Sequence, residues 1–568
     1  ILPNINLITE HFLNFSDLRV LDLSSNSIIL NLTATWMPRC QLDFIGLQSC
    51  QLGTQFPQWL QTQREFSFID ISRANISDVV PDWFWNRSAK VYHIDLSHNY
   101  FRGEVPEFTE SVSLTKLDLS GNNLHGPLPH FSPKMMTLDL AENSFNGTLA
   151  PVCESLVMNN SLGYLDLSSN FLSGQLSDCW RYGKNLEALI LANNSLSGEI
   201  PHSIGYLANL IYLQLQGNIF SKNLPSSLEN IAGLEILDVS ENRLSGNIPF
   251  WIGESLKRLM ILKLSRNKLD GNIPWQICQF RYLYDLDLSS NALSGTIPRC
   301  FKNLHTLSGV EEAPSFTYGP YADYRIHGTL VVKGRFYVYD FSLPLRVIDL
   351  AENHLSGEVP SEITSLIALR GLNLSRNSFT GTIPRDIANM RYLEFLDLSW
   401  NKLSCSIPPS IVEIPSLAFA NFSFNGLTGK IPSGCQFATF ENSSYVGNPD
   451  LCGLPVSEFC SDHLDDDITH CDKQEVHATQ HGENNWLEEF SFYISMGIGF
   501  NTSFWVFWAT LMLKRSWRYA YMRFLDNMGN KIYVFAAIRL KMNKQQRGTR
   551  VSNHQKNKVC PHRASGKK

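Results

Sequence analysis

The chain has 568 residues, of which 47 are Lys or Arg and 53 are Asp or Glu, so its formal net charge is −6. This slightly acidic balance does not favour binding of nucleic acid. The length also exceeds what one compact hydrophobic core organises, so the chain must consist of several domains or of repeats.

A module of about 24 residues recurs along most of the chain, as in LTKLDLSGNNLHGPLP from Leu114 to Pro129. An asparagine marks each of sixteen units, except that two other residues replace it early in the array. A period in this range with the pattern L-x-x-L-x-L-x-x-N is the signature of a leucine-rich repeat. The marker positions are Asn26, Cys50, Ala74, Asn99, Asn122, Asn143, Asn170, Asn194, Asn218, Asn242, Asn267, Asn291, Asn353, Asn377, Asn401 and Asn425.

The pattern has a physical reason. In Leu117-Asp118-Leu119 the two leucines face one side of a short strand, and only stacked neighbouring units bury that side. We expect each marker asparagine to point inward and bond the turning backbone, because buried peptide groups need partners. The tail L-S-G-x-I-P closes each coil without a long helix and resembles the plant-type repeat. The sequence therefore predicts an α/β solenoid, a right-handed superhelix of about sixteen repeats with short parallel strands on its concave face.

The first repeat unit starts close to Ile1, with no charged segment and apolar run of the kind that marks a signal peptide. We therefore expect the chain to be truncated at its N-terminus, and to lack the cap that covers the end of a solenoid.

Changes in composition and spacing predict seven segments. The step from Asn291 to Asn353 is too long for one unit and indicates an aromatic, β-rich insertion, with a flexible bulge as the alternative. The predicted segments are leucine-rich repeats over 1–301, an island insertion over 302–343, the last four repeats over 344–432, a C-terminal cysteine cap without repeat character over 433–460, an acidic stalk over 461–489, a transmembrane helix over 490–513 and a basic cytoplasmic tail over 514–568.

The stretch from Phe490 to Leu513 contains no charged residue. As a helix its 24 residues extend about 36 Å, enough to cross a hydrocarbon core of about 30 Å. After it come fifteen Lys or Arg residues against one acidic residue, Asp526. Positive residues stay on the cytoplasmic side, so we expect a single-pass type I protein of the plasma membrane with its repeats outside.

Twelve cysteines are present, and three pairs occupy matched places in the array. Such pairs predict disulfides and an oxidising compartment, with reduced buried cysteines as the alternative. The sequence also offers pairings of Cys40 with Cys50 and of Cys405 with Cys435. The three predicted pairs are Cys153 with Cys179, Cys278 with Cys300, and Cys452 with Cys460.

Ten N-x-S/T sequons precede residue 490. Together with the disulfides they favour a glycosylated ectodomain. The candidate asparagines are Asn14, Asn31, Asn75, Asn86, Asn146, Asn159, Asn193, Asn373, Asn421 and Asn442.

No motif in the sequence indicates an enzyme. The tail of about 55 residues is too short for a kinase and lacks its Gly-rich loop, HRD and DFG motifs. We find no phosphate-binding loop, no nucleophile elbow and no metal-spaced His/Cys set, and we expect no cofactor. The direct interpretation is a membrane-anchored binding protein.

Residues that flank the inward leucines of each strand should face the concave surface, and most of them are Asp or Ser. Exposed aromatic and Arg residues are the usual anchors of binding surfaces, although lateral packing between adjacent strands is the alternative. The ligand-binding candidates are Phe44, Phe68, His93, Tyr164 and Tyr212, six residues before their markers, and Arg73, His98 and Arg266, next to theirs.

The repeats, the island before the last four units, the run GNPDLCGLP from Gly447, the acidic stalk, FYISMGIGF from Phe492 and KRSWRYAYMRFL from Lys514 resemble plant leucine-rich-repeat receptor-like proteins. The resemblance is closest to the subgroup that includes the fungal ethylene-inducing-xylanase receptors and related resistance proteins. It implies recognition of an extracellular protein or peptide ligand at the cell surface, and signalling through an adaptor receptor-like kinase and a co-receptor kinase near the last repeats.

The resemblance also implies pairing through the membrane span, where Gly499 and Ser503 offer a small-x-x-x-small face. Tyr519 and Tyr521 resemble tyrosine-based sorting motifs, with an aromatic belt at the membrane interface as the alternative.

The sequence favours a receptor in plant defence. The alternatives are a component of a developmental peptide receptor, a secreted-type binding inhibitor similar to the polygalacturonase-inhibiting proteins, and a decoy that does not signal.

Overall fold

The computed structural model describes residues 7–8, 16–30, 36–86, 90–108, 113–158, 161–312, 314, 327–332, 335–340, 345–434, 437–456 and 460. The chain forms two compact units, 1–468 and 469–568, and every described residue belongs to the first.

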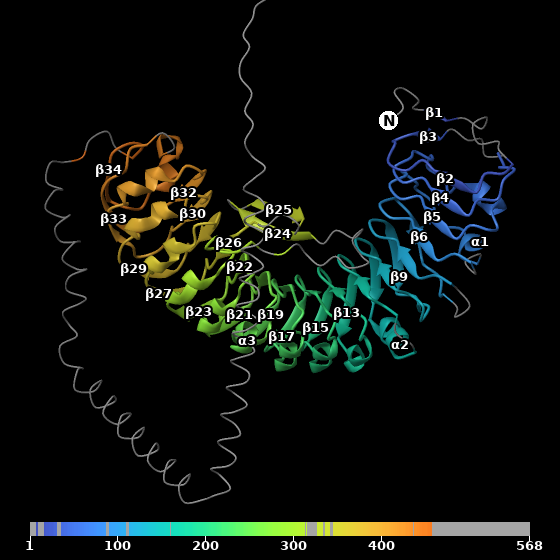
Figure 1. Cartoon of the computed structure of the whole chain (residues 1–568), viewed down its shortest axis with the longest axis horizontal. Helices are drawn as coiled ribbons and strands as arrows, with labels where there is room; N and C mark the ends of the chain where they lie inside the picture. Colours follow the sequence, from blue (N-terminus) through green and yellow to red (C-terminus); the bar gives the residue numbers. More distant parts are fainter. Residues whose placement is uncertain are drawn as a thin grey trace, which may run out of the picture. The chain divides into compact units, whose positions relative to one another are not determined.

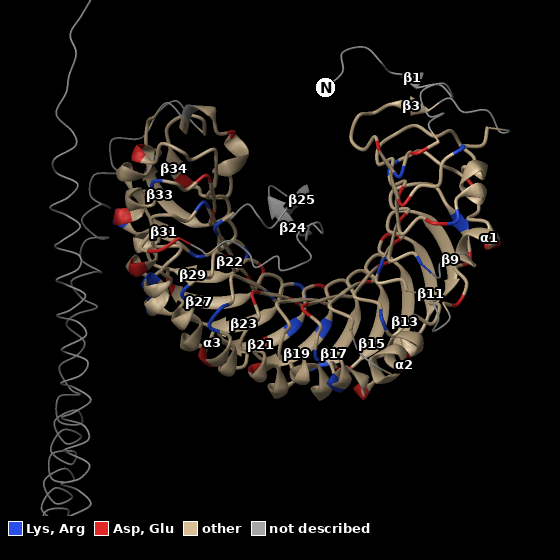
Figure 2. Ribbon diagram, turned by 45° about the vertical axis from the view of Figure 1, so that its right-hand side comes forward, with Lys and Arg blue, Asp and Glu red and all other residues tan. Residues whose placement is uncertain are grey.

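One strand from each repeat joins a sixteen-stranded parallel sheet, which confirms the predicted solenoid. Figures 1 and 2 show these strands along the inner side of the stacked coils. In sheet order they are β2 (Val20–Asp22), β4 (Phe44–Gly46), β5 (Phe68–Asp70), β6 (His93–Asp95), β8 (Lys116–Asp118), β10 (Thr137–Asp139), β12 (Tyr164–Asp166), β14 (Ala188–Ile190), β16 (Tyr212–Gln214), β18 (Ile236–Asp238), β20 (Ile261–Lys263), β22 (Asp285–Asp287), β26 (Val347–Asp349), β28 (Gly371–Asn373), β30 (Phe395–Asp397) and β32 (Phe419–Asn421).

Eleven of the repeats contribute a further strand after the marker residue, and these strands form a second parallel sheet. Its strands are β7 (Arg102–Gly103), β9 (Asn123–Pro127), β11 (Ser144–Gly147), β13 (Phe171–Gln175), β15 (Ser195–Gly198), β17 (Ile219–Lys222), β19 (Arg243–Asn247), β21 (Lys268–Asn272), β23 (Ala292–Gly295), β27 (His354–Glu358) and β29 (Ser378–Thr380). The smaller sheets pair β1 (Leu7–Ile8) with β3 (Ile29–Leu30), and join β31 (Ser404–Cys405), β33 (Gly426–Lys430) and β34 (Asp450–Cys452).

Short helical turns close the convex side. Pro201 shows why, because its backbone is extended and the turn begins only after it, burying Ile204. The α-helices are α1 (Asp82–Trp85), α2 (Ala150–Met158) and α3 (Trp251–Ser255), and the 3-10 turns are η2 (Gln58–Thr62), η3 (Asp178–Tyr182), η4 (His202–Tyr206), η5 (Ser226–Asn230), η6 (Trp275–Gln279), η7 (Arg299–Asn303), η9 (Ser361–Ser365), η10 (Arg385–Asn389), η11 (Pro409–Glu413), η12 (Phe437–Thr439) and η13 (Asn442–Ser444).

The marker asparagines form the expected buried ladder. The Nδ2 group of Asn122 donates to the backbone oxygens of Leu96, Leu119 and Ser120 at 3.1, 3.0 and 3.2 Å. Its Oδ1 accepts the backbone N–H of Phe101 at 2.9 Å. One side chain therefore satisfies buried peptide groups in two successive coils. Where Cys50 replaces asparagine, its thiol donates a hydrogen bond to the backbone oxygen of Leu23 at 3.3 Å.

The predicted cap continues this ladder. Asn448 donates to the oxygens of Phe422 and Tyr445 at 3.0 and 2.9 Å, and accepts the N–H of Leu427 at 3.1 Å. Strand β34 also pairs in parallel with β33. The expectation that this segment has no repeat character is wrong, because Asn448 satisfies the backbone groups of the preceding coil in the same way as a marker asparagine.

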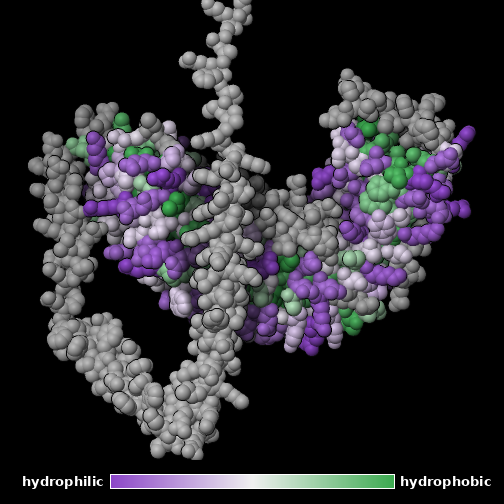
Figure 3. All heavy atoms as spheres, in the orientation of Figure 1, coloured by the Kyte–Doolittle hydropathy of each residue, from purple (hydrophilic) through white to green (hydrophobic). Residues whose placement is uncertain are grey.

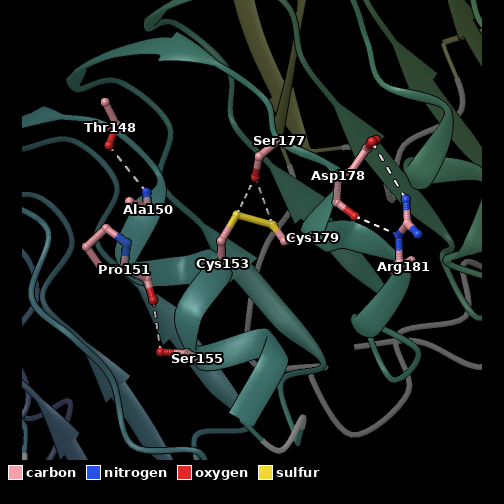
Figure 4. Close-up of a disulfide and its surroundings, with 9 residues drawn as sticks. All are labelled: Thr148, Ala150, Pro151, Cys153, Ser155, Ser177, Asp178, Cys179 and Arg181. Carbon is pink, nitrogen blue, oxygen red and sulfur yellow. Dashed lines mark hydrogen bonds and ion pairs between the residues drawn. A yellow bond between two sulfur atoms is a disulfide. The ribbon is translucent and has the colours of Figure 1, made fainter.

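Three disulfides join the predicted cysteine pairs. Cys153 of α2 bonds Cys179 of η3, with a Cα–Cα distance of 5.3 Å (Figure 4). The other two bonds join Cys278 to Cys300 and Cys452 to Cys460. The first two bonds tie neighbouring coils on the convex side, where a crosslink resists their separation.

The pairing of Cys40 with Cys50 is wrong. Both are free, and both are buried in the apolar interior, where Cys50 occupies a marker position. Burial raises the pKa of both thiols. Cys405 is disulfide-bonded, and its predicted partner Cys435 lies outside the described residues.

The insertion contains an antiparallel pair, β24 (His327–Val332) with β25 (Arg335–Asp340), at the predicted alternating stretch. Among the described residues, no helix has the length and apolar character needed to cross a membrane. The predicted stalk, the span over 490–513, the tail, and the sites at Gly499, Ser503, Tyr519 and Tyr521 lie outside the described residues.

Candidate functional site

The concave surface is built from three rows of side chains that run across the repeats. The first and second rows are the first and third residues of each strand of the sixteen-stranded sheet, and register pairing places them side by side. The middle residue of each strand, such as Leu117, is buried in the interior. The third row consists of the residue directly before each marker.

The third row has a left-handed backbone. Arg73, His98, Trp400 and Phe424 have φ values of 55°, 52°, 55° and 54°. This conformation costs a non-glycine residue roughly 1 kcal/mol. The same conformation recurs at Ser49 and Ser169, so it belongs to the repeat, and the candidates in this row are distinguished by their large side chains.

An N-terminal cluster consists of Phe44, Phe68 and His93 in the first row with Arg73 and His98 in the third. The rings of Phe44 and Phe68 stack at 4.1 Å, and those of Phe68 and His93 at 4.3 Å. All three rings are half-buried, whereas Arg73 and His98 are exposed. Lateral packing therefore does occur in the first row, and the stacked rings remain partly exposed.

The second row beneath this cluster is acidic. Asp70, Asp95 and Asp118 are adjacent in register, and each accepts a backbone N–H two residues on, such as Ser97 N–H at 2.9 Å to Asp95. Burial, and then repulsion from Asp118 and Asp70, raises the pKa of Asp95 to about 8. Burial likewise raises the pKa of Asp70 and Asp118. Burial thus favours the neutral form of all three carboxyls.

Tyr164 and Tyr212 were expected as exposed anchors, and this expectation is wrong. Only 3% of Tyr164 and 5% of Tyr212 is exposed. The hydroxyl of Tyr164 donates to Asp166 Oδ2 at 3.5 Å, two residues along the same strand. Both side chains lie within the surface, so they offer no free ring to a ligand.

A C-terminal groove with a cavity volume of about 490 Å³ lies over β18 to β32. The predicted residue Arg266 lines it, at 3.6 Å from Glu241. Lys263 lies deeper, 3.4 Å from Asp285. The pKa of Lys263 is raised, because nearby Asp285, Asp238 and Asp287 outweigh the opposing effect of burial. Other lining residues are Glu352, Arg376, Phe395, Trp400 and Phe419.

At this end the third row is continuously linked. Glu352 accepts the hydroxyl of Ser290 at 2.6 Å and lies 3.5 Å from Arg376. The guanidinium of Arg376 lies 5.5 Å from the ring centroid of Trp400, and the rings of Trp400 and Phe424 stack at 4.0 Å. The two rings remain 46% and 39% exposed.

Sequence reasoning missed Arg376, Trp400 and Phe424, although each directly precedes a marker. The criterion that selected Arg266 finds them once it is applied to every repeat. The stacked pair Phe395 and Phe419, at 4.9 Å in the first row, was missed in the same way.

The structure separates the sequon asparagines by exposure. Asn75, Asn86, Asn146, Asn193 and Asn442 are exposed. Asn373 and Asn421 are half-buried in the C-terminal groove, where their Nδ2 groups donate to Asp349 and Asp397 at 3.0 and 3.3 Å. Asn14, Asn31 and Asn159 lie outside the described residues. Glycosylation stays a prediction.

Apolar surface also gathers over the N-terminal repeats on the face drawn in Figure 3. Exposed apolar side chains of the N-terminal repeats include Val20, Ile29 and Met37. Within the part of the chain that the structure describes, no group of three His, Cys, Asp or Glu residues could hold a metal ion.

Comparisons with known proteins agree with this architecture. Sequence models of the leucine-rich-repeat family match residues 344–403, and also 113–135, 185–207, 233–255 and 282–304. Receptor-like protein EIX2 of Solanum lycopersicum is 42% identical over 545 residues, which cover 94% of this chain and 52% of the relative. The chain thus spans about half the length of the curated relatives it matches.

Solved structures of plant receptor ectodomains are also similar. The HAESA ectodomain of Arabidopsis, in complex with an extended IDA peptide hormone, has a TM-score of 0.61 and 27% identity over 78% of this chain and 71% of that one. HAESA in complex with IDA and the co-receptor SERK1 has a TM-score of 0.57 and 25% identity, covering 80% of this chain and 77% of that one.

Proposed function

We propose that this chain, which is 42% identical to two plant receptor-like proteins over more than nine tenths of its length, is itself a leucine-rich-repeat receptor-like protein. It binds an extracellular ligand and signals through a partner receptor-like kinase. The observation that carries this proposal is the identity of 42% across 94% of the chain, far beyond the residues that the repeat models match. The proposal includes a partner that supplies the kinase because residues 514–568 contain no kinase motif.

The ligand is a protein or peptide that lies on the concave surface. Supporting this, HAESA holds a peptide hormone in an ectodomain of similar fold. The two concave clusters supply exposed aromatic and Arg side chains, which are the usual anchors of such contacts.

The co-receptor kinase contacts the last repeats. The support is the linked row from Glu352 to Phe424, whose ring edges remain exposed. The HAESA ectodomain, which has a similar fold, has also been solved in complex with the co-receptor SERK1. The row is held by its own contacts, so docking requires little side-chain ordering.

Defence is the first candidate role, because the sequence resembles the xylanase-receptor subgroup. A developmental peptide receptor is the second, favoured by the similarity to a hormone-binding ectodomain. Exposure of leaf cells that express the chain to fungal culture filtrate separates the two. An ethylene or oxidative response that depends on the chain supports defence, whereas a response only to endogenous peptides supports development.

The proposed topology is a single pass through the plasma membrane at 490–513, with a glycosylated ectodomain outside. Protease added to intact cells should remove the repeats and spare an epitope after Lys514. Loss of that epitope would reverse the orientation.

The decisive experiment expresses the chain in leaf cells behind a secretion leader, with a tag after Lys568, and identifies the kinases that co-purify. We expect a receptor-like kinase whose recovery is lost when residues 490–513 are replaced by an unrelated span. A protein that reaches the surface and recovers no kinase would instead be a decoy or a simple binding protein.

A further inference from the structure

We propose that the N-terminal cluster together with Lys116 is a subsite for an acidic segment of the peptide or protein ligand. This inference rests on the proposed function and names the chemistry of one part of the ligand. It concerns repeats two to five, at the opposite end of the array from the C-terminal groove.

The first row places an aromatic stack beside a cation. Register pairing aligns Phe44 with Phe68, Phe68 with His93, and His93 with Lys116. The rings are nearly parallel, with interplanar angles of 7° and 13°. Lys116, which is half-buried, therefore continues the row in which the three rings stack.

Two cations of this region are available to a ligand. The three rows contain five Lys or Arg side chains, and three of them are paired, as Lys263 with Asp285, Arg266 with Glu241 and Arg376 with Glu352. Within the described residues, neither Arg73 nor Lys116 forms an ion pair. Arg73 is exposed at a left-handed φ of 55°, a conformation that costs free energy in a non-glycine residue.

The acidic row lies next to these cations, and Arg73 lowers the pKa of Asp118 against the larger, opposing effect of burial. Asp70 and Asp118 each accept a serine hydroxyl at 2.7 Å, so their carboxyls are engaged along their own strands. Burial raises the pKa of both, and it raises the pKa of Asp95 to about 8. The raised pKa values favour the neutral form of these carboxyls, which weakens the negative charge beside Arg73 and Lys116.

The packing of the rings selects a peptide over an acidic sugar. Sugars stack on open aromatic faces, but Phe68 has a ring on each side. The outer positions of the stack adjoin Val20 and Lys116 in register. Partly exposed rings and two cations suit carboxylate and apolar side chains along an extended peptide.

The test measures binding to the full chain in detergent by fluorescence anisotropy. The probes are a labelled peptide of alternating Glu and Tyr, its Lys and Tyr counterpart, and an oligogalacturonide. The variant is Arg73→Gln with Lys116→Gln. The matched control is Arg243→Gln with Lys268→Gln, which removes one exposed Arg and one exposed Lys from the eleven-stranded sheet.

We expect the acidic peptide to bind, and its Kd to rise about tenfold or more in the variant and less than about twofold in the control. Added salt should weaken the binding. Unchanged affinity in the variant, no binding of the acidic peptide, or tighter binding of the oligogalacturonide would each overturn the proposal. Recovery of a kinase from cells is independent of this result, so failure of the subsite and failure of the receptor role are distinguishable.

Discussion

At the N-terminal end of the concave surface Arg73 stands without an ion pair among the described residues, whereas at the C-terminal end Arg376 is held between Glu352 and Trp400. Both residues occupy the third row and share the same left-handed backbone. The repeat therefore fixes the position of a side chain, and the residues in the neighbouring coils determine whether its charge has an ion-pair partner. Free charges suit ligand capture, and a linked row suits a preformed docking surface.

The largest expected effect concerns the asparagine ladder, which is complete in the last repeats and interrupted at Cys50 and Ala74. Asn401 donates to the oxygens of Leu374, Leu398 and Ser399. Asn401→Ala leaves these groups and a backbone N–H without a partner and should lower the free energy of unfolding by about 3 kcal/mol, measured by chemical denaturation.

Its matched control is Asn123→Ala, at an exposed position on the second sheet, with an expected change below about 0.5 kcal/mol. Equal effects of the two substitutions would mean that the ladder does not hold the coils together.

A second comparison uses two glycines of equivalent position. A Cβ at Gly447 would lie 2.6 Å from Phe424 Cδ1, and a Cβ at Gly121 would lie 2.6 Å from His98 Nδ1. The Cβ at Gly447 would also lie 3.0 Å from Phe424 Cα, which is backbone and cannot rotate away, whereas the distance from the Cβ at Gly121 to His98 Cα would be 3.3 Å. Gly447→Ala should therefore cost about 2 kcal/mol and Gly121→Ala about 1 kcal/mol.

The two thermal denaturation midpoints report this difference directly. A larger loss for Gly121→Ala would show that the N-terminal row, and not the C-terminal one, is the rigid end.

The third prediction concerns pH. Asp95, Asp118, Asp139 and Asp166 are consecutive in register, whereas Asn373 and Asn421 alternate with the acids of the last repeats. The pKa of Asp95 is raised to about 8 in the folded state. As pH rises, the Asp95 carboxyl therefore loses its proton at a lower pH in the unfolded chain than in the folded chain, which favours unfolding. Stability should fall as pH rises from about 4 to about 8 and then level off.

Asp95→Asn should remove part of this fall, on the order of 1 kcal/mol between about pH 5.5 and 7.5. Hydrogen exchange at the two pH values should show the larger loss of protection in β5 to β12, where these carboxyls adjoin one another. A smaller loss is expected at β26, where burial, and then Asp287, raises the pKa of Asp349 to about 8. A fall centred on β26 to β32, or stability that rises over this range, would contradict the account.

The smallest expected effect is the difference in unfolding free energy between substitutions of Arg376 and of Arg73. Arg376→Gln removes a partly exposed ion pair and a cation–π contact, and should cost roughly 0.5–1 kcal/mol. Arg73→Gln removes no such contact and should stay within about 0.5 kcal/mol. Denaturation of both variants in one buffer tests this, and an equal cost would mean that Arg73 has a structural partner.

Much of this fold follows from local sequence, because each repeat contacts its neighbours and a spacing rule places every strand. The sixteen strands and the disulfides of Cys153 and Cys278 follow from that rule. Asn448 was missed because the residues around it, GNPDLCGLP, differ from the repeat even though the asparagine performs the same task.

The candidate site was less predictable. The stacking of Trp400 on Phe424 depends on which residues share a row, and this is visible only once all repeats are aligned. The burial of Tyr164 and Tyr212 depends on three-dimensional surroundings that a spacing rule does not contain.

The most direct test of the difference between the two ends is hydrogen exchange of the full chain with and without the acidic Glu and Tyr peptide. The account predicts added protection in peptides that cover β4 to β8, and little change from β26 to β32. Protection confined to the C-terminal groove, or none at either end, would contradict the claim that the free charges of the N-terminal cluster receive the ligand.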